Sequence, residues 1–405
     1  MSDCGRDANS MQNGGAFPTS PVAARPRLPE EREKFQLGYR PALDGLRGVA
    51  ILAVMATHAQ LASGWAGDVG VDIFFVLSGF LITSLLIEEW DRFGSISLRR
   101  FYARRALRLL PALMVMLAVV VIWHCLINRQ VAPRTALDGF IALFYSSNWM
   151  FALGLRQPVH VFAHTWTLSI EEQFYLWWPI ALILLLRRCG SRASLVHWVM
   201  LSMFILAVER VVLFAGMPRG AYNWLGYATE ARADTLLMGC VAAVMLCSKP
   251  IPRNGKLSVA LKYSAWLIGI PGLILIGSLA ARSAGFCAVG LHITTAFFGV
   301  LILVEAVISE AGMLAWLLSV RWLVYIGKIS YGLYLWHYPI FCEVQARKWP
   351  MRYELVVELG LTVLATVVSF HLIERPALKL KGRFDAGKAE RKTSIKTSPE
   401  LADAK

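Results

Sequence analysis

Charged residues are scarce in this chain, and their scarcity decides its class. Asp, Glu, Lys and Arg make up only 17% of the 405 residues, whereas 57% of the residues are hydrophobic. A soluble globular domain carries about 25% charged residues. The composition therefore excludes an ordinary soluble enzyme and predicts a polytopic membrane protein.

Paired cysteines, a secretory signal and internal repeats are also missing. The seven cysteines are odd in number and contain no CxxC pair, which argues against a disulfide framework or a zinc site. Residues 1–38 are polar and lack the basic-then-apolar pattern of a signal peptide, so we expect a disordered cytoplasmic tail there. A second such tail is expected at 379–405. The absence of a repeat disfavours the inverted-repeat plan of many transporters.

Acidic residues are the rarer charge, with 27 Asp and Glu against 41 Lys and Arg. The basic excess lies between apolar runs and in the tails, which is typical of cytoplasmic loops beside membrane lipid. We therefore expect no nucleic-acid partner.

Long apolar runs are abundant instead. Ten of them reach the length of about 20 residues that a bilayer requires. They are 43–63, 69–90, 109–127, 167–186, 194–215, 228–247, 261–281, 287–308, 322–342 and 354–374. The sequence thus predicts an all-α bundle of about ten transmembrane helices, with both termini cytoplasmic and a membrane domain at 39–378.

An eleventh apolar stretch, 137–155, has Ser146, Ser147 and Asn148 at its centre. Counting it as a crossing would move the basic cluster of residues 187–192 outside, against the positive-inside tendency. We therefore predict one outer segment, 128–166, with a partly embedded helix. This scheme leaves the basic residues 347–352 outside.

The first apolar run, LDGLRGVAILAVMATH, contains Arg47 and His58. An ionisable side chain at membrane depth costs at least about 2.5 kcal/mol, so such residues mark a functional interior. The two are eleven positions apart, which is about three helical turns or roughly 16 Å, and they share a face. An imidazole is suited to general base catalysis near neutral pH. The alternative for His58 is a packing role with a hydrogen bond to a neighbouring helix.

Three carboxylates lie near the outer ends of predicted helices. Asp72 should reach the depth of His58 and orient it, although capping of its own helix explains it equally well. Glu171 and Glu172 follow in HTWTLSIEEQFYLWWP. Adjacent helical residues point about 100° apart, so one of the two can face the bundle. The alternative is a pair that interacts with the helix dipole.

The loop FYARRALRLLPAL carries Arg104, Arg105 and Arg108. Arg105 and Arg108 are one turn apart and can present two guanidinium groups to one phosphate, so acyl-CoA is the candidate ligand. An anchor at the cytoplasmic membrane face is the alternative. His160 and His164 have helical ligand spacing but lack the glutamate of an HExxH motif, and no metal is predicted.

Together the motifs DGLRG, GVDIFFVLSGFLIT, FYARRALRLLPAL, HTWTLSIEEQFYLWWP, ISYGLYLWHYP and IERP occur in an order that resembles the membrane-embedded acyltransferase-3 family of bacteria. The resemblance covers about residues 39–378. It implies transfer of an acyl group, usually acetyl, from cytoplasmic acyl-CoA to a hydroxyl of a carbohydrate or glycolipid in the cell envelope, by an inner-membrane protein. Some members carry an additional SGNH-type domain, for which we expect no room in this chain.

By this resemblance, His58 matches the essential histidine of the family and Arg47 its partner arginine. Arg105 and Arg108 match its RxxR motif, the expected acyl-CoA contact. Glu171 and Glu172 match its EEQFY motif.

Two questions stay open at the level of sequence. His58 is either the general base for the acceptor hydroxyl or the carrier of the acyl group, and the acceptor is a polysaccharide, lipopolysaccharide, peptidoglycan sugar or glycosylated metabolite. The alternative function is a transporter or flippase for a lipid-linked sugar, with Arg47, His58, Asp72 and Glu171 along a polar path.

Overall fold

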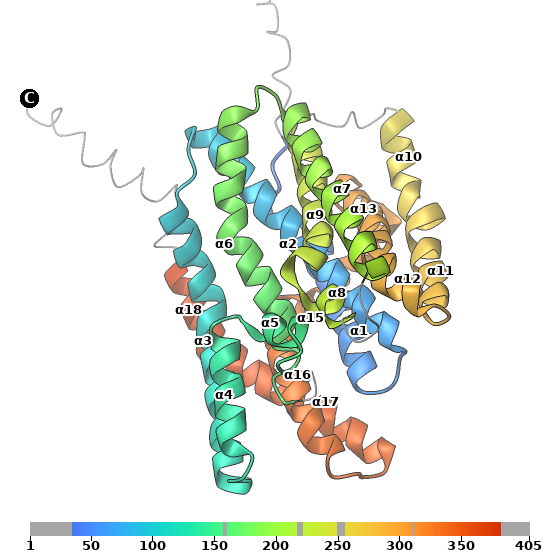
Figure 1. Ribbon diagram of the computed structural model, residues 1–405. Helices are drawn as coiled ribbons and strands as arrows, with labels where there is room; N and C mark the ends of the chain where they lie inside the picture. Colours follow the sequence, from blue (N-terminus) through green and yellow to red (C-terminus); the bar gives the residue numbers. More distant parts are fainter. Residues whose placement is uncertain (1–34, 157–159, 217–221, 249–255, 310–311, 382–405) are drawn as a thin grey trace, which may run out of the picture. The chain divides into compact units, whose positions relative to one another are not determined.

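The computed structural model describes residues 35–156, 160–216, 222–248, 256–309 and 312–381. Within these ranges every regular element is a helix, so the predicted all-α fold is confirmed (Figure 1). The helices are α1 (Pro41–His58), α2 (Gly64–Phe93), α3 (Leu98–Ile127), α4 (Ala132–Leu143), α5 (Ser147–Ala152), α6 (Thr165–Arg188), α7 (Arg192–Gly216), α8 (Tyr222–Tyr227), α9 (Thr229–Ser248), α10 (Lys256–Ser264), α11 (Ile270–Ala280), α12 (Ala284–Val289), α13 (Leu291–Ile308), α14 (Met313–Leu318), α15 (Arg321–Lys328), α16 (Ser330–Gln345), α17 (Met351–Ser369) and α18 (Arg375–Lys381). One π-helical turn precedes α11 and another joins α17 to α18.

Seven helical segments of the described chain are long and apolar enough to cross a membrane. They match seven of the ten predicted runs. The other three runs correspond to α1, to α6 and to α15 with α16. Their composition explains the difference, because α1 and α6 contain ionisable residues of the candidate site, such as Arg47 and Glu171, and α16 has only 16 residues. The total of ten crossings stays a prediction.

The stretch at 137–155 forms two short helices instead of one long one. α4 has 12 residues and α5 has 6, and the chain turns between them at Tyr145 and Ser146. Asn148 is fully buried, and its amide donates to the Thr229 hydroxyl at 2.9 Å and to the Tyr227 carbonyl at 3.2 Å. Each helix is too short to cross a bilayer, and the polar centre is satisfied inside the protein.

The packed part of the chain begins earlier than the sequence predicted. Leu37 is buried, and its backbone N–H donates to the Glu88 carboxylate at 2.5 Å. Residues 35–38 thus belong to the folded domain and correct the predicted tail boundary at 38. The rest of the N-terminal tail and residues 382–405 of the C-terminal tail lie outside the described residues.

Helices α2 and α9 cross with their backbones in close contact. A Cβ added to Gly79 would lie 1.9 Å from the Leu236 carbonyl oxygen, and one added to Gly239 would lie 2.1 Å from the Val76 carbonyl oxygen. Since both obstacles are backbone atoms, only glycine permits this approach. The crossing fixes the part of α2 that includes Ser78, a residue of the candidate site.

Gly79→Ala is therefore expected to destabilise the fold by about 1–3 kcal/mol, the usual cost of forcing an extra methyl group into a packed interior. Thermal unfolding of the purified protein in detergent measures the loss. Gly299→Ala is the matched control, because a Cβ there would meet only side-chain atoms at 3.9 Å. Equal unfolding temperatures for the two variants would contradict the packing argument.

Candidate active site

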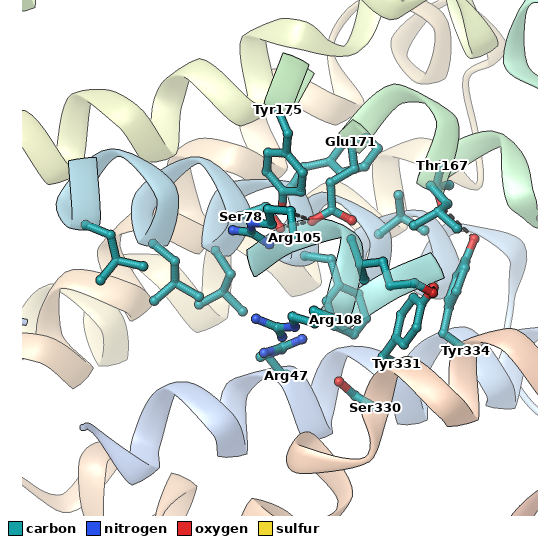
Figure 2. A pocket seen from close by; sticks show the side chains of 18 residues that line it. Arg47, Ser78, Arg105, Arg108, Thr167, Glu171, Tyr175, Ser330, Tyr331 and Tyr334 are labelled. Atoms are coloured by element: carbon teal, nitrogen blue, oxygen red, sulfur yellow. Dashed lines mark hydrogen bonds between the residues drawn. The ribbon is translucent and has the colours of Figure 1, made fainter. Parts of the chain in front are cut away.

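A cavity of about 190 Å³ lies between α1, α2, α3, α6 and α16 (Figure 2). One wall is apolar and comes mainly from α2. The polar lining residues are Arg47, Ser78, Arg105, Arg108, Thr167, Glu171, Tyr175, Ser330, Tyr331 and Tyr334. The cavity thus brings together residues from five helices and from five of the six motifs that the sequence singled out.

Three arginines dominate the charge of the cavity. Figure 2 shows Arg47 from α1 and Arg108 from α3 side by side, with Arg105 above them. The Arg105 guanidinium stacks on the Tyr175 ring, with its carbon 4.2 Å from the ring centroid. None of the three forms a salt bridge with a carboxylate of the described residues. The cavity therefore presents positive charge that suits an anionic ligand.

Glu171 is the one carboxylate among the lining residues of this cavity. Its Oε1 accepts hydrogen bonds from the Ser78 and Tyr175 hydroxyls, so α2 and its own helix both hold it in place. Glu172 is outside the lining, and its buried Oε1 has no hydrogen-bond partner among the described residues. The two neighbouring carboxylates thus point in different directions, as the sequence predicted, and only Glu171 faces the cavity.

His58 belongs to a cluster of aromatic rings beside the cavity. Its Nδ1 lies 3.2 Å from Nε2 of His337, and its ring centroid lies 4.9 Å from that of Tyr338. The His164 ring stacks on Tyr338 at 5.2 Å and lies 5.6 Å from His337. Both ring nitrogens of His164 are buried without a partner among the described residues. Three histidines from α1, α16 and the start of α6 therefore meet in one place.

Tyr334 connects the histidine cluster with the cavity. It lines the cavity, and its ring lies 5.3 Å from His164 and 5.7 Å from His337. Its hydroxyl donates to the His164 carbonyl and also contacts the Thr167 hydroxyl. His58 itself does not line the cavity. Of the two residues predicted on the first helix, Arg47 therefore lies at the cavity and His58 lies in the histidine cluster.

Two predicted site residues are directed elsewhere. The Asp72 carboxylate binds Arg232 of α9 at 2.8 Å and His292 of α13 at 3.0 Å. The expectation that it orients His58 is corrected, because these two partners take up the carboxylate in another part of the core. Arg104 pairs with Glu89 at 3.5 Å and is absent from the cavity lining, unlike Arg105 and Arg108.

Several residues of the site were absent from the sequence-based candidates. Tyr175 follows Glu171 by four positions, and this helical spacing could have identified it. His337 is an ionisable residue in an apolar run, the same signal that identified His58. Tyr334 lies in an aromatic-rich segment, which a sequence alone cannot distinguish from an interfacial belt. Ser78 had no comparable signal.

Comparison with known proteins places the chain in a family. Residues 40–373 match the family model described as an acyltransferase domain, Acyl_transf_3. Peptidoglycan O-acetyltransferase OatA of Listeria monocytogenes is 33% identical over 85% of this chain and 57% of its own length. The O-acetyltransferase OatA of Staphylococcus aureus is 34% identical over 84% of this chain and 57% of its own. The putative peptidoglycan O-acetyltransferase YrhL of Bacillus subtilis is 34% identical over 84% of this chain and 55% of its own length.

The chain thus spans little more than half the length of these relatives. No solved structure matches it. The family match covers nearly all of the described helices, and seven of their segments can cross a membrane. The chain is therefore a multi-pass membrane protein that belongs to the acyltransferase-3 family.

Proposed function

We propose that this protein is an O-acyltransferase of the bacterial cytoplasmic membrane. It moves an acyl group, in the first place acetyl, from cytoplasmic acyl-CoA to a hydroxyl of a cell-wall carbohydrate. The observation that carries the proposal is the cavity in which Arg47, Arg105 and Arg108 converge without a salt bridge to any carboxylate in the part of the chain that the structure describes, next to the histidine cluster.

The donor is assigned from the charge of the cavity. Coenzyme A carries a diphosphate and a further phosphate, and arginine binds such groups through paired N–H donors. Arg105 and Arg108 are one helical turn apart, and Arg47 adds a third cation from α1. The apolar α2 wall, with Phe74 and Leu81, suits the uncharged arm that leads from the phosphates to the thioester.

The chemistry then requires a base for the acceptor hydroxyl. In the proposed reaction the His58 imidazole takes the hydroxyl proton while the oxygen attacks the thioester carbonyl. The carbon–sulfur bond breaks, and CoA leaves as a thiolate that takes up the proton from the His58 imidazolium, which restores the neutral base. Because His58 lies beyond Tyr334 from the cavity, the thioester end of the donor must extend past the Tyr334 side chain.

Glu171 is proposed to position the donor-binding groups. Its carboxylate is held by Ser78 and Tyr175, and the Tyr175 ring in turn packs against the Arg105 guanidinium. This arrangement restrains a flexible arginine before the ligand arrives, which lowers the entropy cost of binding.

The acceptor is proposed from the relatives. The Listeria monocytogenes relative is a peptidoglycan O-acetyltransferase, and a glycan hydroxyl of peptidoglycan is accordingly the first acceptor to test for this chain.

The test uses the purified full chain in lipid vesicles with acetyl-CoA and soluble peptidoglycan fragments. We expect acceptor-dependent release of free CoA thiol, together with fragments heavier by one acetyl group in mass spectrometry. Release of thiol without acetylated fragments would indicate a thioesterase instead. The absence of both thiol and acetylated fragments would refute an acyltransferase that acts on this acceptor.

A further inference from the structure

We propose that His337 is a positioning residue that fixes the tautomer of His58. In this tautomer Nδ1 of His58 carries the hydrogen and Nε2 keeps the free lone pair. The inference deepens the proposed function, since it rests on His58 as the base and identifies the nitrogen that takes the proton.

One side of the His337 ring faces its own helix, α16. Its Nδ1 lies 3.0 Å from the Leu333 carbonyl oxygen, one turn earlier on α16. A carbonyl oxygen only accepts, so Nδ1 must be the nitrogen that carries hydrogen. The ring is fully buried and forms no salt bridge with a described carboxylate, which favours its neutral form. A neutral imidazole has one N–H, and Nε2 of His337 is therefore an acceptor.

The other side of the His337 ring faces His58. Nε2 of His337 and Nδ1 of His58 are 3.2 Å apart, at the upper end of hydrogen-bond distances. Since the His337 nitrogen can only accept, the His58 nitrogen must donate. The single hydrogen of the neutral His58 ring is then on Nδ1, which leaves the lone pair on Nε2. A general base requires such a lone pair on the nitrogen that faces its substrate.

The same contact also supports the product of proton transfer. After Nε2 of His58 takes a proton, the ring is a cation and its Nδ1–H becomes a charge-assisted donor to His337. A buried carboxylate has this role in the serine protease triad. Here Asp72, the carboxylate that was predicted to orient His58, is bound to Arg232 and His292. A neutral histidine, His337, occupies the orienting position instead.

Helix α16 restrains His58 at a second point. The Gln345 side-chain amide donates to the His58 backbone carbonyl at 2.9 Å and to the Glu358 carboxylate at 2.8 Å. Edge-to-face packing against Phe341 at 5.7 Å limits rotation of the His337 ring. Helix α16 thus contacts both the backbone and the ring of His58, and the ring also interacts with the Val54 backbone of its own helix.

The decisive measurement is the ¹⁵N NMR spectrum of the full chain in detergent micelles, with labelled histidine at neutral pH. The chain has eight histidines, and the His58 signals are assigned by their loss in His58→Gln. We expect the native protein to show protonated Nδ1 and unprotonated Nε2 at His58. The opposite tautomer in the native protein would overturn the proposal without any substitution at His337.

Two variants test the cause. His337→Phe removes the acceptor and is expected to shift His58 toward the Nε2–H tautomer, whereas His337→Gln places an amide oxygen near the former Nε2 and should preserve the native one. His197→Phe is the matched control, because His197 is exposed and its Nδ1 makes the same one-turn contact, to the Ala193 carbonyl at 2.9 Å. An unchanged His58 tautomer in a folded His337→Phe protein would refute the proposal.

Kinetics separate this inference from the proposed function. We expect kcat to fall by about 10- to 10⁴-fold in His337→Phe, the range seen when a catalytic histidine loses its orienting partner, with KM for acetyl-CoA unchanged. His337→Gln should recover much of kcat. A tautomer shift without any loss of kcat would keep the positioning role and reject His58 as the base, and so it would count against the proposed function instead.

Discussion

His58→Ala is expected to lower acyl transfer by about 10²- to 10⁴-fold, the contribution of a general base to the rate. The methyl group of alanine cannot accept the acceptor proton, and water cannot easily replace an imidazole that is wedged between His337 and Tyr338. The measurement is the rate of CoA thiol release in vesicles, together with the acetyl content of cell-surface glycans by mass spectrometry. KM for acetyl-CoA should stay close to its native value, because His58 does not line the arginine cavity.

His371→Ala is the control for this experiment, since His371 is exposed and contacts only Phe370 among the aromatic rings described. It should retain native activity. Native activity in a well-folded His58→Ala protein would mean that the essential base lies elsewhere in the cluster. His164, whose buried ring nitrogens have no hydrogen-bond partner among the described residues, would then be the next candidate.

The sequence alone could predict those residues of the site that are energetically costly to place in a membrane-spanning helix. Arg47, His58 and Glu171 are ionisable groups in apolar runs, and the cost of placing them there identifies them without any structure. The helical fold followed for the same reason, because only helices satisfy their own backbone groups over such runs.

The part that could not be predicted depends on which helices are neighbours. From its depth, Asp72 fits either an interaction with His58 or a cap of its own helix, because depth leaves the rotation of a helix and its partners undetermined. The close α2–α9 crossing at Gly79 and Gly239 and the packing of α13 on the same helices decide that Asp72 meets Arg232 and His292. Arg104 and Arg105 show the same limit, since adjacent arginines on one helix point to Glu89 and to the cavity respectively.

Replacement of both Arg105 and Arg108 by alanine is expected to weaken acyl-CoA binding by about 10²- to 10⁴-fold. A hydrogen bond to a charged group contributes about 1.5–3 kcal/mol, so two lost arginine–phosphate contacts amount to about 3–6 kcal/mol. The measurement is KM for acetyl-CoA, supported by direct binding of a non-hydrolysable thioether analogue. The Arg105→Lys and Arg108→Lys pair should be intermediate, because lysine keeps the charge but loses the planar paired donors.

Arg104→Ala is the control that separates ligand recognition from a topological role. Arg104 neighbours Arg105 in the same basic segment, yet it pairs with Glu89 and lies outside the cavity lining. If the cluster serves only as a cytoplasmic anchor, all three arginines contribute alike and Arg104→Ala weakens expression or insertion as much as the others do. If the cavity binds the donor, Arg104→Ala leaves KM unchanged while the double variant raises it, and the charge of the folded cavity, not the charge of the loop, is what selects acyl-CoA.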